Sequence, residues 1–434
     1  MNAFDKIIGY TSIKKELMQI SDTLKNQEIY NKLGVSAPRG LLLYGEPGVG
    51  KSLMASAVIE DSGRPVFCCR KNSPNGDFIK KIKATFDKAA ENAPSIVFLD
   101  DMDKFANGDE RYPDTEEYVT VQSCIDAVKG KEVFVLATAN DIDCLPDSLC
   151  RAGRFDRTIE VNAPKGEDAI EIITYYLESK RFVDGIDPVV IAKIMDGHSC
   201  ADLETVINEA GLYAGYERAE SITMEHFLKA CLHTVFDKKG LADEQDDFSS
   251  HLSDPHHMAS QMIYHETGHA VVSEVLSPGS VTLVFAGSVR QEEGGFTSYY
   301  RDPGKFLLEW KKGRIISALG GAAAMEQKFG ITDIGCERDL DHAFSMTRDL
   351  LVNACIKGFS LYEGRYADSE RILSDREQAV AAEIENYYRK AKEIISANWD
   401  FFEKLASALA EKKLLSAADI QNIKKECRIV SVAV

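Results

Sequence analysis

The sequence lacks any pattern that would tie its ten cysteines to a disulfide framework or to a cysteine-based zinc site. The cysteines are scattered, and no two of them have the CxxC spacing. Zinc sites made of cysteine depend on such close pairs, and disulfide frameworks are typical of short secreted chains. We therefore expect reduced, mostly buried thiols, as in a cytoplasmic protein.

Positive charge and long apolar runs are also scarce. The chain has 51 Lys and Arg against 69 Asp and Glu, which gives a formal net charge of -18 at pH 7. Binding to nucleic acid needs clustered cations, and so does docking on anionic lipid, so neither is expected as a general function. No apolar run approaches the roughly 18 residues of a membrane helix, and no signal peptide is recognisable. We expect a soluble cytoplasmic protein, associated with a membrane only if an anchor precedes residue 1.

The chain is long enough for two or three domains. In 1–165, short apolar runs alternate with helical patterns, which predicts a parallel α/β sheet with strands buried on both faces. The expected strands are GLLLYG, PVFCC, SIVFLDD, VFVLATAN and RTIEV. The pattern is wholly helical in 166–236, and 237–254 is polar and acidic, like a linker. In 255–434 we expect a short strand region, SVTLVFAG and GGFTSYY, among long helices such as 376–410.

A glycine-rich loop follows the first expected strand and precedes a helical segment. The loop fits the pattern GxxxxGK[ST] and consists of Gly45, Glu46, Pro47, Gly48, Val49, Gly50, Lys51 and Ser52. In such loops the backbone N–H groups wrap phosphates, the lysine reaches the β and γ oxygens, and the hydroxyl binds Mg²⁺. The alternative is an ordinary glycine turn, but the strand–loop–helix context favours a nucleotide site.

Polar residues follow the later strands in an order that supports this site. Asp100 would hold the Mg²⁺ shell, and Asp101 would polarise the attacking water. Asn140, at the end of the next strand, is placed to sense the γ-phosphate. Arg151 and Arg154 keep their charge and suit transition-state stabilisation in a neighbouring subunit's site. Any one of these could be a surface residue at a strand end, but their combined order favours the functional reading.

Two histidines four residues apart indicate a second site. In YHETGHAVV, His265 and His269 leave the same face of a helix one turn apart, so both imidazoles can bind one Zn²⁺. Glu266 points about 100° away around the helix, where it can take a proton from water without binding the metal. The alternative is an amphipathic helix with two satisfied histidines. We expect this helix to have Asp254 as its N-cap and Pro255 as its first residue.

A zinc site of this kind needs a third protein ligand. The short-spaced third histidine of some zincins is absent, because AVVSEVLSPGS follows the motif. The spacing leaves several candidates open: Asp333, Glu337, Asp339, Asp341 and His342. His256 and His257 lie upstream of the motif, and we interpret them as surface residues.

The chain resembles a known family over residues 4 to about 425. Its opening FDKIIG, the stretch LGVSAPRGLLLYG and the helix HSCADLETVINEA resemble an AAA+ ATPase module over 4–236. The blocks HETGHAVV, LGGAAAMEQKFG and GCERDL resemble those of the FtsH-type membrane-anchored metalloproteases. The resemblance implies a multidomain fold: an AAA+ parallel αβα sheet with a helical lid, followed by a mainly α-helical zinc peptidase domain.

The resemblance also implies roles that spacing alone leaves open. It makes Asp339 the third zinc ligand and places Ile8 and Gly9 against the adenine of ATP. It implies a homo-hexameric ring, because the arginines of such modules act across subunits. GGFTSYY resembles an edge strand to which an extended polypeptide substrate adds. The implied function is ATP-driven delivery of unfolded polypeptide to zinc sites, where Glu266 carries a proton from water to the leaving amine.

The sequence departs from the family pattern at four points, and the first two would weaken the motor. Asp101 stands where the family has glutamate, and the pore-loop position at 73–76 carries no aromatic residue. Cys200 replaces a glycine, and the ATPase module begins at residue 4 with no membrane helix before it. The lead hypothesis is an ATP-dependent zinc endopeptidase. Two alternatives remain: a nucleotide-gated remodelling ring with weakened hydrolysis, and an ATP-independent zinc peptidase on an AAA+ scaffold.

Overall fold

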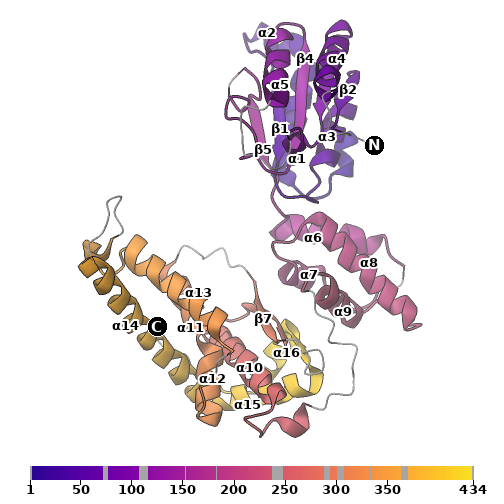
Figure 1. Ribbon diagram of the computed structural model, residues 1–434. Coiled ribbons are helices and arrows are strands. Elements are labelled where there is room, and N and C mark those ends of the chain that lie inside the picture. Colours follow the sequence, from indigo (N-terminus) through magenta and orange to yellow (C-terminus); the bar gives the residue numbers. More distant parts are fainter. Residues whose placement is uncertain are drawn as a thin grey trace. The chain divides into compact units, whose positions relative to one another are not determined.

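The chain forms two compact units, Met1–Ala230 and Cys231–Val434, each with its own hydrophobic core (Figure 1). The computed structural model describes residues 2–71, 77–106, 116–151, 153–181, 183–236, 248–287, 294–300, 307–332, 335–362 and 370–432. The expected pore-loop position at 73–76 and most of the expected linker lie outside these residues. Among the helices described, none is both long and apolar enough to cross a membrane.

The first unit contains a five-stranded sheet in which all neighbouring strands are parallel. Its strands are β1 (Gly40–Tyr44), β2 (Val66–Cys69), β3 (Ser95–Leu99), β4 (Val133–Ala139) and β5 (Arg157–Glu160). They lie in the order β2-β3-β4-β1-β5, and each falls within one of the apolar runs expected to be a strand. The predicted parallel α/β sheet is confirmed. β4 is buried along its whole length, as continuous apolar runs require.

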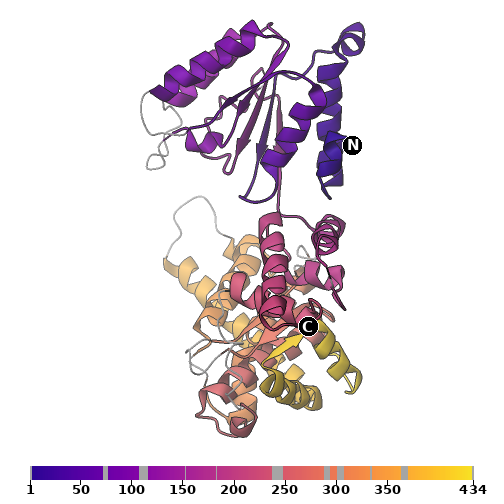
Figure 2. The same cartoon turned by 90° about the vertical axis from the view of Figure 1, so that its right-hand side faces the viewer.

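Helices cover both faces of this sheet (Figure 2). The elements are η1 (Ala3–Lys6), α1 (Thr11–Lys25), α2 (Gln27–Lys32), α3 (Lys51–Ser62), α4 (Asp77–Glu91), η2 (Met102–Lys104) and α5 (Glu116–Ala127). A helical group follows, with α6 (Gly166–Glu178), α7 (Pro188–Ile194), α8 (Cys200–Tyr216) and α9 (Met224–Thr234). α8 begins at a capping box in which Ser199 and Asp202 each bond the other's backbone N–H, so the lid segment is helical as expected.

The second unit is mainly helical and is built around α10 (Met258–Leu276). The other helices are η3 (Ser249–His251), α11 (Leu308–Ala318), α12 (Gly320–Phe329), α13 (Glu337–Arg348), η4 (Asp349–Asn353), η5 (Phe359–Leu361), α14 (Glu370–Ala397), α15 (Trp399–Lys412) and α16 (Ala417–Lys425). Of the 19 residues of α10, 14 are buried, which is typical of a central helix surrounded by others.

A small antiparallel sheet lies beside α10. It contains β6 (Val281–Phe285), β7 (Phe296–Tyr299) and β8 (Leu414–Ser416) in the order β7-β6-β8. The first two strands match the expected strand region, but β8 lies where only helices were expected. The expected long helix 376–410 is interrupted at Asn398, between α14 and α15.

The start of α10 was predicted wrongly. The N-cap is His257, whose Nδ1 accepts a hydrogen bond from the N–H of Ala259 at 3.2 Å. Asp254 instead accepts a bond from the N–H of His256 at 2.9 Å, so it makes a turn before the helix. The ring of His257 also stacks on that of His251, with centroids 3.8 Å apart. His257 is therefore a structural cap rather than a simple surface residue.

The fully buried carboxylate of Glu274 connects the C-terminal end of α10 to neighbouring elements through hydrogen bonds. The oxygens of Glu274 accept bonds from the N–H groups of Gly279 and Val281, each at 3.0–3.1 Å. They also accept bonds from Nε2 of Gln421 at 2.8 Å and from Nζ of Lys424 at 2.9 Å. These bonds tie α10 to the start of β6 and to α16. A buried carboxylate without partners is strongly destabilising, so the stability of the second unit depends on these bonds to Glu274.

The ten cysteines differ in burial. Three are buried, five are partly buried, and Cys68 and Cys144 are exposed, so the thiols are less buried than expected.

Candidate active site and nucleotide site

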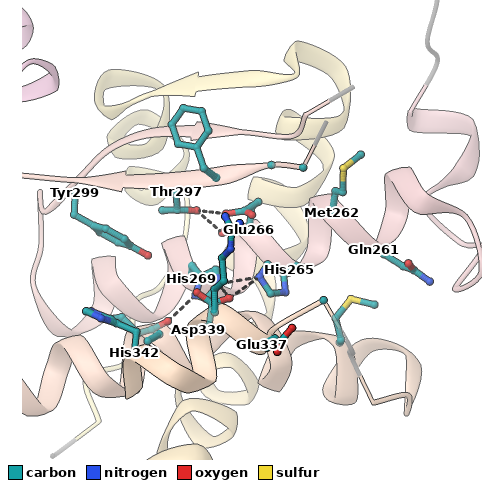
Figure 3. A pocket seen from close by; sticks show the side chains of 18 of the residues that line it. Gln261, Met262, His265, Glu266, His269, Thr297, Tyr299, Glu337, Asp339 and His342 are labelled. Atoms are coloured by element: carbon teal, nitrogen blue, oxygen red, sulfur yellow. Dashed lines mark hydrogen bonds and ion pairs between the residues drawn. The ribbon is translucent and has the colours of Figure 1, made fainter. Parts of the chain in front are cut away.

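Three side chains that can bind a metal converge in the second unit (Figure 3). His265 and His269 come from α10, and Asp339 comes from the first turn of α13. Nε2 of His265 lies 3.0 Å from Nε2 of His269 and 3.2 Å from Oδ2 of Asp339. The third separation, from Nε2 of His269 to Oδ2 of Asp339, is 3.3 Å, so the three ligand atoms form a nearly regular triangle. Within the described part of the chain, this is the cluster of His, Cys, Asp and Glu side chains that could hold a metal ion.

The triangle has the dimensions of a zinc site. Zn–N and Zn–O bonds of about 2.0–2.1 Å in tetrahedral geometry place neighbouring ligand atoms about 3.3–3.4 Å apart. The three separations, 3.0 to 3.3 Å, are close to that value. The three residues therefore fit one zinc ion and leave a fourth position for water or substrate, as catalytic zinc sites do.

The backbone orients one imidazole for metal binding. Nδ1 of His269 lies 2.7 Å from the carbonyl oxygen of Ser317, at the end of α11. Because a carbonyl oxygen can only accept a hydrogen bond, Nδ1 carries the proton and Nε2 is left free for a metal. Ser317 was not expected at the site, since nothing in the sequence distinguishes a backbone carbonyl.

A glycine makes room for the other imidazole. A Cβ atom at Gly321, in α12, would lie 2.5 Å from Cε1 and Nδ1 of His265. Gly268 of α10 and Gly320 of α12 lie directly against each other, since a Cβ on Gly268 would lie 2.3 Å from the carbonyl oxygen of Gly320. The block LGGAAAMEQKFG, noticed only for its resemblance, therefore lets α12 approach α10 directly behind the histidines.

Asp339 is electrostatically suited to be a ligand. Burial would raise the pKa of its carboxyl, but hydrogen bonds and positive charge from His265 and His269 outweigh it and hold that pKa well below its usual range. The carboxylate is thus in the ionised form that binds metal. The other candidates stand apart from the triangle. Glu337 and His342 line the same cavity but are exposed, Asp341 is also exposed, and Asp333 lies outside the described residues.

Glu266 lies beside the three ligands and is almost enclosed. Its Oε2 accepts a 2.8 Å hydrogen bond from Oγ1 of Thr297 on β7. Burial raises the pKa of Glu266, although the two histidines and the bond from Thr297 act in the opposite direction. A Cβ at Gly295 would lie 2.8 Å from Cγ of Glu266, so β7 passes this close only because glycine stands there. Neither Thr297 nor Gly295 was identified from the sequence.

These residues line an open cavity of about 770 Å³. Three methionines, Met258, Met262 and Met325, line part of it together with Ile331. Thr297 and Tyr299 of β7 line it too, together with Arg314 of α11. The cavity is large enough for several residues of an extended peptide.

In the first unit, the glycine-rich loop joins β1 to α3 as expected. Nζ of Lys51 donates to the carbonyl oxygens of Gly45 and Glu46, at 2.7 and 2.8 Å. Burial lowers the pKa of Lys51, and the nearby Asp103 and Asp101 oppose this shift. Gly48 has φ +80° and its carbonyl accepts a 3.1 Å bond from the N–H of Ala201 in α8. The rest of the loop is Pro47, Val49 and Gly50, and Ser52 lies in the first turn of α3.

The two carboxylates after β3 share Arg70, since its Nε lies 3.7 Å from Oδ2 of Asp100, but their closest partners differ. Oδ1 of Asp100 accepts a bond from Oγ1 of Thr138 at 2.9 Å, on the neighbouring strand β4. Oδ2 of Asp101 pairs with Nη2 of Arg70 at 3.0 Å and with Nζ of Lys104 at 2.9 Å. Burial would raise the pKa of Asp101, but these two cations lower it overall. The carboxylate expected to polarise water is therefore engaged by two cations that the sequence did not point to.

Asn140 directly follows β4, which neighbours β1 in the order β3-β4-β1, so these polar residues share one edge of the sheet with the glycine-rich loop. Its N–H and Nδ2 donate to the carboxylate of Asp103 at 3.0 and 3.2 Å. Ile8 and Gly9 lie between η1 and α1, and Gly9 packs against the backbone of Asp168, at the start of α6.

The two arginines lie elsewhere. Both precede β5, whose amino end is at the opposite edge of the parallel sheet from the glycine-rich loop. A Cβ at Gly40, the first residue of β1, would lie 2.4 Å from the carbonyl oxygen of Arg154. Nη2 of Arg154 pairs with Asp126 at 2.9 Å, whereas Arg151 is exposed. The structure therefore does not bring either arginine to the nucleotide loop of its own chain.

Comparison with known proteins agrees with both sites. Residues 41–163 match the ATPase family associated with various cellular activities (AAA), 185–229 match the AAA+ lid domain, and 256–423 match peptidase family M41. The ATP-dependent zinc metalloprotease FtsH of Caldicellulosiruptor bescii is 28% identical, over 97% of this chain and 71% of that protein. Those of Mycoplasma pneumoniae and Mycoplasma genitalium are 29% and 30% identical over 98% of this chain.

The chain spans 62% and 63% of the length of the two Mycoplasma proteins. The first matched segment contains the nucleotide loop, and the last contains His265, His269 and Asp339. The lid segment lies between them in the chain. Together, they show that the chain belongs to the family of FtsH-type AAA+ zinc metalloproteases.

Proposed function

We propose that this chain is an ATP-dependent zinc endopeptidase that cleaves unfolded or loosely folded polypeptides, with its ATPase module in 1–236 and its peptidase domain in 255–434. The observation that carries the proposal is the triangle of His265, His269 and Asp339 with the enclosed carboxylate of Glu266 beside it. A zinc ion held there would polarise the scissile carbonyl and lower the pKa of water.

The residues of the chain perform the proton transfers. Glu266 accepts a proton from the attacking water and returns it to the nitrogen of the leaving amine. Its raised pKa suits both steps, because the carboxyl has to take up the proton and then release it. Thr297 holds one oxygen of Glu266, which fixes the direction of the other. Asp339 stays ionised and keeps its place as a ligand.

The small sheet offers a place for the substrate. β7 is an edge strand in the order β7-β6-β8, and its residues line the cavity. An extended polypeptide can therefore add to β7 through backbone hydrogen bonds and lie across the histidines. Only a segment free of other structure can do this, which is why we propose unfolded or loosely folded substrates.

The position of the arginines supports a ring of identical subunits. Arg151 and Arg154 lie at the sheet edge opposite their own nucleotide loop. Arg151 is exposed there and so can reach the loop of a neighbouring subunit, whereas Arg154 pairs with Asp126. We propose a homo-hexamer, the assembly that the family resemblance implies. The scattered cysteines, which lack any CxxC pair, suit a reducing compartment such as the cytoplasm. The remodelling ring and the ATP-independent peptidase are not favoured by the family matches.

The test is cleavage of a fluorescently labelled, permanently unfolded polypeptide by the zinc-loaded protein with ATP, with a non-hydrolysable analogue, and without nucleotide. Cleavage that needs hydrolysable ATP is expected. Glu266→Gln should abolish cleavage and keep nucleotide binding, and Lys51→Ala should stop cleavage by preventing nucleotide use. Absence of cleavage by an assembled, zinc-loaded protein would overturn the proposal.

A further inference from the structure

The alternation of side chains along β7 places Tyr299 on the face of the strand that looks into the active site. Side chains two residues apart in a strand point to the same side. Thr297 bonds Glu266, and Tyr299 follows it on that side. Phe296 points the other way, since its ring packs on Phe236 and Phe285 at centroid distances of 4.5 and 5.6 Å. Tyr299 accordingly lines the cavity.

The hydroxyl of Tyr299 is directed at the metal-binding group. Figure 3 shows the phenol extending from β7 with its oxygen toward the side of the cavity where His269 and Asp339 lie. The ring is held from the other side by α11, because the guanidinium carbon of Arg314 lies 4.0 Å from the ring centroid. A phenol carries its proton at neutral pH, so Tyr299 can donate a hydrogen bond. Burial raises its pKa further, against the charge of Arg314 and an interaction with the hydroxyl of Ser273 of α10.

Hydrolysis of a peptide bond creates a need for such a donor. The oxygen of water forms a bond to the carbonyl carbon while Glu266 takes its proton, and the π electrons of the C=O bond move onto the carbonyl oxygen. When these electrons return, the C–N bond breaks, and the nitrogen leaves with the proton from Glu266. In between, the carbonyl oxygen carries negative charge that a fixed donor can stabilise. Glu266 and Thr297 are already bonded to each other and do not serve this oxygen.

We propose that Tyr299 is a catalytic residue whose phenolic O–H donates a hydrogen bond to the scissile carbonyl oxygen as negative charge develops there, and that Arg314 positions the phenol. This inference rests on the proposed endopeptidase function. It gives the strand GGFTSYY a chemical role in addition to that of a docking edge.

The test replaces the hydroxyl and nothing else. Tyr299→Phe keeps the ring that packs on Arg314, and we expect kcat to fall about 100-fold, the usual effect of losing one such donor, with KM little changed. Tyr300→Phe is the matched control: it removes the same hydroxyl from the next residue, which follows β7 and does not line the cavity, and it should leave kcat unchanged. Zinc content and melting temperature are measured for every variant and should equal those of the wild type.

A second readout does not depend on turnover. A phosphinic peptide carries charged oxygens on a tetrahedral centre and so imitates the developing oxyanion. By calorimetry with zinc-loaded protein, it should bind Tyr299→Phe about 10- to 100-fold more weakly than the wild type. A peptide with the sequence of a cleavage product should bind both proteins equally.

Arg314 is tested as a positioning residue. Arg314→Met should lower kcat without raising KM, and Arg314→Lys should recover part of the loss because it restores a cation over the ring. In the Tyr299→Phe background, Arg314→Met should have no further effect on kcat. A full additional loss in that background would show that Arg314 acts independently of the phenol.

The outcomes separate this inference from the proposed function. If the wild type cleaves and Tyr299→Phe matches it, or changes KM alone, Tyr299 is not a catalytic residue while the peptidase function stands. Tyr299 is likewise ruled out if His342→Ala, in the same cavity, lowers kcat and Tyr299→Phe does not. If the zinc-loaded wild type cleaves nothing, both proposals fail together.

Discussion

Replacing Gly321 by alanine should strongly lower the affinity for zinc, although it changes no charge and no hydrogen-bonding side chain. The added Cβ would lie 2.5 Å from two atoms of the His265 ring and 2.7 Å from Nε2, the atom in the ligand triangle. Carbon atoms pack best at about 3.5–4.0 Å, so the ring has to retreat by about 1 Å. Metal–ligand distances tolerate about 0.2 Å, so His265 could no longer bind a zinc ion shared with the other two ligands.

The expected loss can be bounded from this displacement. Changing a residue that only supports a ligand typically lowers metal affinity about 10- to 100-fold. Because Gly321→Ala moves the ligand itself, we expect a loss of at least about 100-fold, which corresponds to about 2.7 kcal/mol. Competition with a chromophoric chelator measures the zinc affinity, and circular dichroism confirms that the variant is folded.

Gly313→Ala provides the matched control. Gly313 is also a buried helical glycine, in α11, but the nearest atoms to an added Cβ there are 3.9 Å away. This variant should keep its zinc affinity, and its stability should be equal or higher by up to about 1 kcal/mol, because alanine favours helix. If Gly321→Ala bound zinc as tightly as Gly313→Ala, the steric argument would be refuted.

Three further predictions concern the partners of buried or paired carboxylates. Lys424→Met should lower the free energy of unfolding by about 3–5 kcal/mol in urea denaturation, because it leaves the carboxylate of Glu274 without its cation, and replacing both residues by Met should recover most of that loss. Thr297→Val should lower kcat about 10-fold at unchanged zinc content, since the general base loses its orienting bond, and an unchanged kcat would count against that role. Arg70→Ser should raise the rate of phosphate release from ATP by freeing Asp101 from one of its two cations; a lower rate would show that Arg70 helps hydrolysis.

The parts of the fold that depend on local pattern were predictable. Continuous apolar runs marked β1, β3 and β4, which are buried along most or all of their length and so have no polar alternation. The outer strands β2 and β5 were also located, but they are partly exposed and were not buried on both faces as expected. The spacing of His265 and His269 also placed both on one helix face, because a helix turns once every 3.6 residues. The third ligand could be named only by family resemblance, because spacing carries no information across the roughly 70 residues that separate His269 from Asp339.

The supporting residues of the site could not be predicted, because their roles arise from contacts across the fold. Ser317 acts through a backbone carbonyl, and Gly321 acts by having no side chain, so neither has a chemical signature in the sequence. Thr297 meets Glu266 only because β7 folds back beside α10. The start of α10 was misplaced because Asp254 and His257 are both able to cap a helix, and the stacking of His257 on His251 is consistent with its selection as the cap.

The ligand triangle also makes the metal a cross-link within the fold. Its corners come from α10 and from α13, two helices that begin about 80 residues apart in the chain and are joined through a segment the metal does not touch. An ion that binds this arrangement and not the unfolded chain adds a free energy that grows with its concentration, about 4.1 kcal/mol at 1,000 times its dissociation constant. The melting temperature of the second unit should therefore rise with the logarithm of free zinc. A cell short of zinc would then lose the folded peptidase as well as its activity.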